Sequence, residues 1–324
     1  MRWGIFLIVA VSLCVLGAAA FAQSPSLALI STEVDDGLDG AGTFMDREVL
    51  SLYPPDFKWS YNVSDVFFDP GDVLGIETGL DAFDVRALSG GQPLYYFSTE
   101  VDFEFLGVAY TDEDLLVYDP MLGIVSRAWD SKVAFGGTDM GFDAACWLYD
   151  EHDGKWMLVF STEVGGVALI DGMPTAFTDG DVLVTDGTSL TGWLDMQGAF
   201  GRNVGLDGLH IWFEEGGPTG LLINVLLSTE VDGVVREVDG DLDGESPDPM
   251  IEFRDQDLLS FSYAFADGPG ALLHTELTWQ GIEDGFGKDV GLDAVYIEFI
   301  PEPATMLMVG LGLAAVGLRL RRRS

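Results

Sequence analysis

A short acidic run in the last third of the chain has the residue types and spacing of a calcium-binding loop. Residues 239–245 read Asp-Gly-Asp-Leu-Asp-Gly-Glu, with three carboxylates at alternate positions and a glycine where the loop must turn. Calcium prefers oxygen ligands arranged in this way. An EF-hand would add a bidentate glutamate at the twelfth position, where this chain has Met250. The run therefore predicts either a solvated acidic turn or a Ca²⁺ site formed by Asp239, Asp241, Asp243 and Glu245.

Two further sets of carboxylates recur at equivalent places along the chain. One set is the glutamate of the tetrapeptide Ser-Thr-Glu-Val, at Glu33, Glu100, Glu163 and Glu230. The other is the aspartate of a Gly-x-Asp pattern, at Asp81, Asp143, Asp207 and Asp293. If either set faces a common axis, mutual repulsion requires bound cations. The alternative is that each Asp caps a turn by accepting backbone N–H bonds and each Glu lies at a solvated strand end.

Residues with the spacing of a catalytic site are not evident. The three histidines, His152, His210 and His274, form no metal-spaced pair, and the sequence contains no Gly-x-Ser-x-Gly and no phosphate-binding glycine loop. Because the chain has 54 acidic residues, a close pair of carboxylates does not by itself identify a glycoside hydrolase. We therefore expect no catalytic residues and no enzyme activity. A carbohydrate-active enzyme on a propeller scaffold is the alternative.

The elements that must position these carboxylates recur in tandem. Ser-Thr-Glu-Val begins at residues 31, 98, 161 and 228, so its spacings are 67, 63 and 67 residues. An Asp-x-Asp/Glu pattern with two aliphatic residues follows each copy, and Gly-x-Asp follows that. Three patterns in the same order, four times over, predict a fourfold repeat.

Each repeat has the pattern of β-strands. After Gly-x-Asp, alternate residues such as Phe83 and Val85 form an apolar face, which predicts a strand with one buried face. The other face is mixed and carries Asp84, Cys146, His210 and Tyr296 at equivalent positions. About four strands per unit favour an all-β, four-bladed propeller-like ring, with a β-sandwich or an open β-array as alternatives. A strand at 293–299 paired with one at 27–34 would close the ring and hide two edges.

The aspartate-containing strands resemble those of hemopexin-type four-bladed repeats, a resemblance of fold and not of function. The residues that carry it are Asp81-Ala82, Asp143-Ala144 and Asp293-Ala294.

Composition limits the partners of the chain. It has 324 residues, 48% of them hydrophobic, and a formal net charge of −39. A packed core is therefore attainable, and nucleic acid and anionic membranes should be repelled because phosphate binding needs clustered Lys and Arg. The same charge attracts cations.

The N-terminus has the pattern of a secretory signal peptide. Met1 and Arg2 precede a charge-free apolar run, residues 5–20, which ends in the cleavage pattern formed by Ala20 and Ala22. A retained membrane anchor is the alternative. Once residues 1–22 are removed, Cys146 stands alone, so the mature chain has no partner for an internal disulfide.

The C-terminus combines three features in a fixed order. Pro301, Glu302 and Pro303 precede the uncharged apolar stretch 304–318. A basic end follows, with Arg319, Arg321, Arg322 and Arg323. As a helix the stretch would span about 22 Å, short of a ~30 Å bilayer core, so thinning and snorkelling arginines would have to bridge the difference. The arginines would stay cytoplasmic and the body outside.

This arrangement resembles the PEP-CTERM sorting signal of Gram-negative bacteria. The resemblance implies transient anchoring in the inner membrane, processing by an exosortase-type enzyme, and delivery to the cell surface or an exopolysaccharide matrix. A plain tail anchor is the alternative. The expected organisation is a signal peptide (1–22), a β-repeat domain (23–300, with units near 26–90, 91–155, 156–220 and 221–300) and a sorting segment (301–324).

We therefore expect a non-catalytic structural or binding module, stabilised by Ca²⁺, whose partners are glycans or matrix proteins. A matrix filler without a specific ligand is a further alternative.

Overall fold

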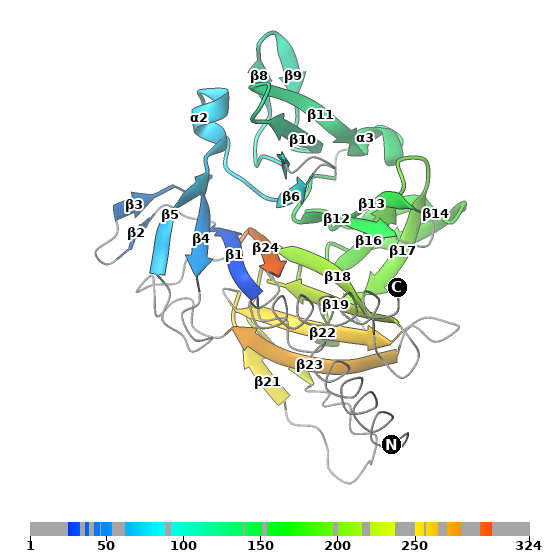
Figure 1. The fold of residues 1–324 in the computed structure, drawn as a ribbon. Helices are drawn as coiled ribbons and strands as arrows, with labels where there is room; N and C mark the ends of the chain where they lie inside the picture. The colour runs from blue at the N-terminus through cyan, green and yellow to red at the C-terminus, as the bar shows by residue number, and fades with distance from the viewer. Residues whose placement is uncertain are drawn as a thin grey trace, which may run out of the picture. The chain divides into compact units, whose positions relative to one another are not determined.

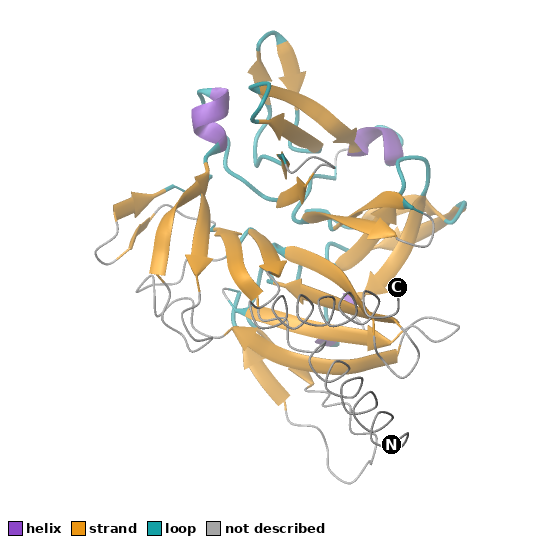
Figure 2. Ribbon diagram, viewed as in Figure 1, coloured by secondary structure: helices purple, strands orange, loops and turns teal. Residues whose placement is uncertain are grey.

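The computed structural model describes residues 25–32, 36–38, 42–45, 47–53, 62–87, 92–138, 140–150, 154–196, 200–215, 221–236, 250–255, 257–264, 271–279 and 292–299. The predicted calcium loop, the signal peptide and the sorting segment, with the hydrophobic helices expected at both termini, lie outside these residues. The described residues are mainly strands, as Figure 1 and Figure 2 show, so the fold is all-β as predicted. Contacts divide the chain into one unit of residues 29–296 and a second of residues 1–28 with 297–324.

Four sheets contain the strands expected from the sequence patterns. Sheet 1 has the order β24 (Ala294–Phe299), β1 (Pro25–Ser31), β4 (Val49–Tyr53) and β5 (Asn62–Phe68). Sheet 2 has the order β6 (Phe83–Ala87), β7 (Pro93–Phe97), β10 (Asp114–Asp119) and β11 (Ile124–Asp130). Sheet 3 has six strands, in the order β12 (Ala145–Asp150), β13 (Lys155–Phe160), β16 (Asp181–Thr185), β17 (Leu190–Asp195), β14 (Gly166–Ile170) and β15 (Met173–Phe177). Sheet 4 has β18 (Leu209–Glu215), β19 (Leu221–Leu227), β22 (Leu258–Ala264) and β23 (Ala271–Trp279).

The first four strands have the same order in all four sheets. A strand that follows Gly-x-Asp comes first, the strand that leads into Ser-Thr-Glu-Val is second, and the strand of Asp-x-Asp/Glu is third. In sheet 1 the first strand is β24, which lies next to β1 although the two come from opposite ends of the chain. The predicted pairing of strands near residues 293–299 and 27–34 is therefore confirmed.

Short hairpins between the second and third strands were not predicted from the sequence. They are β2 (Asp36–Leu38) with β3 (Gly42–Phe44), β8 (Phe103–Phe105) with β9 (Val108–Tyr110), β14 (Gly166–Ile170) with β15 (Met173–Phe177), and β20 (Gly233–Arg236) with β21 (Met250–Phe253). The β8–β9 turn places Leu106 and Gly107 at φ 52° and 79°, a conformation that fits the twist of a two-residue hairpin loop. Leucine is uncommon in such a turn, so the sequence gives no sign of this hairpin. Two one-turn helices, α2 (Pro70–Leu74) and α3 (Ser131–Ala134), complete the described elements.

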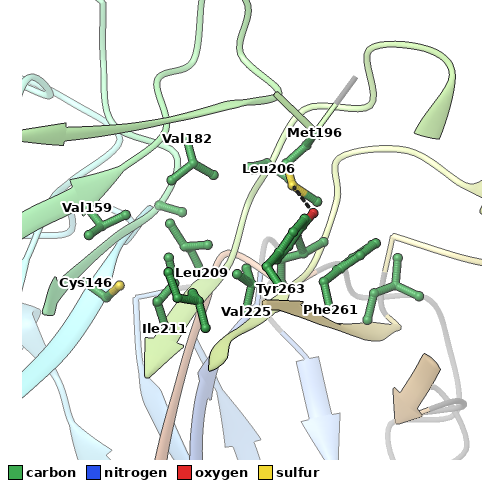
Figure 3. Packing of buried hydrophobic residues seen from close by; sticks show 14 of the residues in the cluster. Cys146, Val159, Val182, Met196, Leu206, Leu209, Ile211, Val225, Phe261 and Tyr263 are labelled. Carbon is green, nitrogen blue, oxygen red and sulfur yellow. Dashed lines mark hydrogen bonds between the residues drawn. The ribbon is translucent and has the colours of Figure 1, made fainter. Parts of the chain in front are cut away.

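Sheets 3 and 4 share a hydrophobic core, which Figure 3 shows. Val159 and Val182 of sheet 3 pack in one cluster with Ile211 and Phe261 of sheet 4, and Phe261 is fully buried. Burial of such a side chain contributes about 1.5–3 kcal/mol relative to exposure. Sheets 1 and 2 meet through aromatic rings, since the Phe68 centroid lies within 5.2–6.0 Å of four rings of sheet 2.

The expectation of one buried face on each first strand is wrong for the mixed face. Asp84, Cys146 and His210, which lie on that face, are all buried. The reason is that the first strand of the next sheet covers it. Asp84 Oδ2 accepts a 2.7 Å bond from the Trp147 backbone N–H, and the His210 ring meets Tyr296 edge to face at 5.1 Å. The alternating sequence pattern shows which side chains share a face of the strand, and it does not show what packs against each face.

Candidate functional site

In sheets 3 and 4 the serine of Ser-Thr-Glu-Val joins its sheet to the next one, whereas the buried Oγ atoms of Ser31 and Ser98 have no hydrogen-bond partner among the described residues. Ser161 Oγ donates to the Leu206 carbonyl at 3.1 Å, and Ser228 Oγ donates to the Leu292 carbonyl at 2.9 Å. Both acceptors are the middle residue of a Gly-x-Asp pattern that begins the following sheet. The tetrapeptide thus holds the Gly-x-Asp turn of its neighbour in place.

The threonine shapes the turn that presents the glutamate. Thr99, Thr162 and Thr229 each donate from Oγ1 to the backbone carbonyl two residues later, at 3.1–3.2 Å. Such a bond stabilises a tight turn after a strand. The equivalent glutamates Glu100, Glu163 and Glu230 therefore leave their strands in the same direction.

Each of these glutamates lies over the glycine of the Gly-x-Asp pattern in its own sheet. A Cβ atom added to Gly79, Gly141 or Gly205 would overlap the carboxylate of Glu100, Glu163 or Glu230, respectively. These glycines also have φ between 62° and 64°, which L side chains rarely adopt. Glycine is thus required twice, by backbone conformation and by the close approach of the carboxylate. The sequence shows the two patterns 21–25 residues apart, and it does not show that they touch.

The aspartates of the pattern lie beside these glutamates. The Oδ2 atoms of Asp81 and Asp143 are buried and have no hydrogen-bond partner among the described residues. The pKa of Asp143 is raised to about 9. Burial is the main cause, and the negative charges of Glu230, Asp207, Glu163 and Asp81 add to it. The pKa of Asp81 is also raised well above its ordinary value, mainly by burial and then by the negative charges of Glu100 and Glu163. We call Asp81, Asp143, Asp207, Glu100, Glu163 and Glu230, which come from sheets 2, 3 and 4, the acidic cluster.

The carboxylates of the acidic cluster are too close together for all of them to be ionised without a compensating proton or cation. Carboxylates that cannot all ionise without repulsion either take up protons or attract a positive ion. The orphaned oxygens of Asp81 and Asp143 are of the kind that a hard cation prefers. Within the described ranges, no group of three or more His, Cys, Asp and Glu side chains is arranged to hold a metal ion directly.

A cavity of about 650 Å³ lies against the β20–β21 hairpin of the same unit. Its lining includes Phe200, Arg202, Asp232, Glu252, Phe253 and Asp257. Asp257 Oδ2 accepts from the Arg254 backbone N–H at 2.9 Å, and Asp232 Oδ1 accepts from the Asp255 N–H at 3.3 Å. These two carboxylates therefore stabilise turns. Aromatic rings and carboxylates thus line the same cavity.

The other residues singled out in the sequence fall in different places. His210 is buried, and burial lowers its pKa to about 4. Cys146 is buried as a free thiol, and burial raises its pKa. His274 lies on β23 opposite Ser262. His152 and the candidate calcium ligands Asp239, Asp241, Asp243 and Glu245 lie outside the described residues.

Comparison with known proteins bears on the C-terminus. The model of the PEP-CTERM protein-sorting motif matches residues 299–323, which confirms the resemblance seen there. The motif indicates an exported protein that exosortase processes and that is sorted to the cell surface of a Gram-negative bacterium. A search of curated proteins found no match to the chain. In the part of the chain that the structure describes, no helix is both long and apolar enough to cross a membrane.

Proposed function

We propose that the protein is a non-catalytic structural or binding module of the cell surface or the exopolysaccharide matrix. The observation that carries this proposal is that the glutamate of Ser-Thr-Glu-Val lies over the glycine of Gly-x-Asp in sheets 2, 3 and 4. From sheets 3 and 4 the serine also bonds to the next Gly-x-Asp. A molecule built from equivalent joints presents several similar loop surfaces, which suits binding of extended polymers. The sorting motif supports delivery to the place where such polymers lie.

We further propose that the four sheets form a four-bladed, propeller-like ring made of repeated units. The support is a chain of neighbour contacts inside the unit of residues 29–296. Phe68 joins sheet 1 to sheet 2, Asp84 joins sheet 2 to sheet 3, and Ser161 joins sheet 3 to the start of sheet 4. The Ser228–Leu292 bond leads from sheet 4 back to β24 of sheet 1. Ring closure of this kind leaves no sheet edge at either end of the repeat series.

A hydrated Ca²⁺ ion at the acidic cluster would stabilise this arrangement. It would offset the repulsion among carboxylates that three sheets bring together. The alternative position is the loop with Asp239, Asp241, Asp243 and Glu245.

Thermal unfolding of the full chain tests the calcium proposal and separates the two positions. We expect Ca²⁺ to raise the Tm at pH 8 and a chelator to reverse the rise, because a ligand that binds only the folded state stabilises it. The double variant Asp81→Asn with Asp143→Asn should lose this response, and Glu104→Gln, an exposed carboxylate on β8, should keep it. Loss of the response in Asp239→Asn with Asp241→Asn instead would assign the ion to the loop. No response in the unmodified chain would reject Ca²⁺ stabilisation.

A carbohydrate-active enzyme is the second candidate, and the cavity beside β20–β21 is the observation that favours it. Glu252 is an exposed carboxylate of its lining. If the protein hydrolyses exopolysaccharide, Glu252→Gln should abolish release of reducing ends while Glu104→Gln leaves it unchanged. Binding of glycans without any release of reducing ends would favour the binding module. The absence of both would favour a matrix filler without a specific ligand.

A further inference from the structure

Aromatic rings and one arginine gather at the ends of β6 and β12 that lie away from the acidic cluster. The Arg86 guanidinium carbon lies 4.2 Å from the centroid of the Trp156 ring and 5.7 Å from that of Trp147. The Tyr149 and Trp156 centroids are 5.0 Å apart, and those of Tyr96 and Trp147 are 5.4 Å apart. We call Arg86, Tyr96, Trp147, Tyr149 and Trp156 the Arg86 platform.

The strand register explains why these rings share one face. Tyr149 of β12 pairs with Trp156 of β13, and Trp147 lies two residues before Tyr149 on the same side of its strand. Arg86 reaches this face from β6 of the neighbouring sheet. Tyr149 is 42% exposed, and Trp147 and Trp156 are partly exposed, so solvent reaches the rings.

The platform has hydrogen-bond donors that the described residues do not satisfy. The Arg86 Nε and Trp147 Nε1 atoms are buried and have no hydrogen-bond partner there. Buried donors in folded proteins are normally paired, and an unpaired donor costs about 1–3 kcal/mol. Oxygen atoms from outside the described residues would satisfy both donors.

Arg86 forms no ion pair in the described part of the chain. Its charge acts there on the Asp84 carboxylate, on the Tyr96 hydroxyl and on the Trp156 ring. The nearest carboxylate along its strand is Asp84. Burial raises the pKa of Asp84 to about 7, while the Trp147 and Val85 backbone N–H groups and the charge of Arg86 lower it. Asp84 is already bonded to the Trp147 backbone N–H at 2.7 Å. In a chain with 54 acidic and 15 basic residues, an arginine without an ion pair points to an acidic ligand.

We propose that the Arg86 platform binds an acidic glycan, with a sugar ring stacked on Tyr149 and Trp156 and a carboxylate of the glycan on Arg86. Aromatic side chains with a polar edge suit a ligand that has one apolar face and a wet rim. Guanidinium matches a carboxylate with two parallel bonds, and the indole N–H of Trp147 can donate to a further oxygen. The proposal rests on the binding function proposed above and assigns it a place and a ligand class.

The repeat geometry sets this platform apart from the scaffold. Counted from the aspartates of Gly-x-Asp, the positions equivalent to Arg86 hold Leu148, Trp212 and Glu298. The arginine therefore occurs once among four equivalent positions, as a specific binding site would require, whereas the acidic cluster uses residues that recur.

The experiment is calorimetric titration of the full chain with oligogalacturonate of defined length, and with its carboxyl-reduced neutral form as the control ligand. We expect Arg86→Gln and Tyr149→Ala each to weaken binding of the acidic form about tenfold or more. Arg127→Gln, an exposed arginine of β11 that is ion-paired with Asp114 and Asp130, is the matched control and should bind as the unmodified chain does. Circular dichroism and the Tm verify that each variant is folded.

Binding should also strengthen as ionic strength rises from about 10 to 150 mM, because salt screens the long-range repulsion of an acidic protein more than a short contact. Equal affinity for the acidic and neutral forms would overturn the assignment of a carboxylate to Arg86. Binding that survives both variants would overturn the platform and leave the binding function standing. If no glycan binds the unmodified chain, the platform and the binding function both fail, and only the structural role is left.

Discussion

The two ends of strands β6 and β12 differ in how their residues are used. At the Gly-x-Asp end, the same contacts occur in sheets 2, 3 and 4: a glutamate lies over a glycine, beside a buried aspartate. At the other end, Arg86, Trp147 and Trp156 form contacts that their equivalent positions do not reproduce. Residues that recur at equivalent positions therefore build the scaffold. Residues that occur at only one of these positions are the candidates for binding a specific ligand.

The largest expected effect concerns pH at the Gly-x-Asp end. The folded state holds protons on Asp143 up to a pKa of about 9, whereas an unfolded Asp releases them near pH 3.9. Between these values the folded state binds more protons, so the free energy of unfolding falls as pH rises. In chelator, we expect the Tm to decrease steadily from pH 5 to pH 9.

The variant Asp143→Asn should flatten this decrease, because it removes one of the groups that must lose a proton. Asp72→Asn, an exposed residue of α2, is the matched control and should leave the slope unchanged. A Tm that rises over this range, or equal slopes in both variants, would contradict the raised pKa at the acidic cluster.

Gly141→Ala should cost about 2 kcal/mol or more of unfolding free energy. Alanine at φ 62° is strained, and its Cβ would overlap the Glu163 carboxylate. Gly136→Ala shares the positive φ, at 68°, but has open space around the added Cβ, so it should cost only about 1–2 kcal/mol. Denaturant unfolding measures both.

Removing the carboxylate sharpens this comparison. Gly141→Ala combined with Glu163→Ala should recover part of the loss in a double-variant cycle, because the overlap is gone and the backbone strain is not. Strict additivity of the two changes would show that glutamate and glycine do not touch in solution.

Ser228→Ala should cost about 1 kcal/mol, since it removes the buried bond to the Leu292 carbonyl. Ser98 has the equivalent place in sheet 2, and its buried Oγ has no hydrogen-bond partner in the described residues. Ser98→Ala should therefore be close to neutral. Equal losses in chemical denaturation would mean that the serines of Ser-Thr-Glu-Val contribute alike and that the joints between sheets do not differ.

The smallest effect on stability is expected at the Arg86 end. Arg86→Gln removes a cation–π contact of about 0.5–1 kcal/mol and leaves the strands intact. Its effect on glycan binding should be much larger than its effect on unfolding. A loss of stability comparable to that of Gly141→Ala would instead place Arg86 with the scaffold.

Much of the fold could be read from the sequence because its strongest signals recur. Alternation after Gly-x-Asp located β6, β12, β18 and β24, and the unpaired patterns at the two ends predicted the pairing of β24 with β1. The β8–β9 hairpin could not be found, because a leucine occupies its positive-φ turn. The burial of Asp84 could not be found either, because the strand that covers it belongs to another sheet.

The sequence alone determined where this protein is sorted and where its β-strands lie, because a sorting signal and the alternation of apolar and polar residues are local properties of the chain. It also supplied the carboxylates and fixed their equivalent positions. Only the tertiary structure decided that the aspartates lie near one another, that each glutamate lies on a glycine, and that Arg86 meets Trp147 and Trp156. These are contacts between residues 21 to 70 positions apart, and their formation depends on how strands pair and sheets pack, which no local pattern encodes.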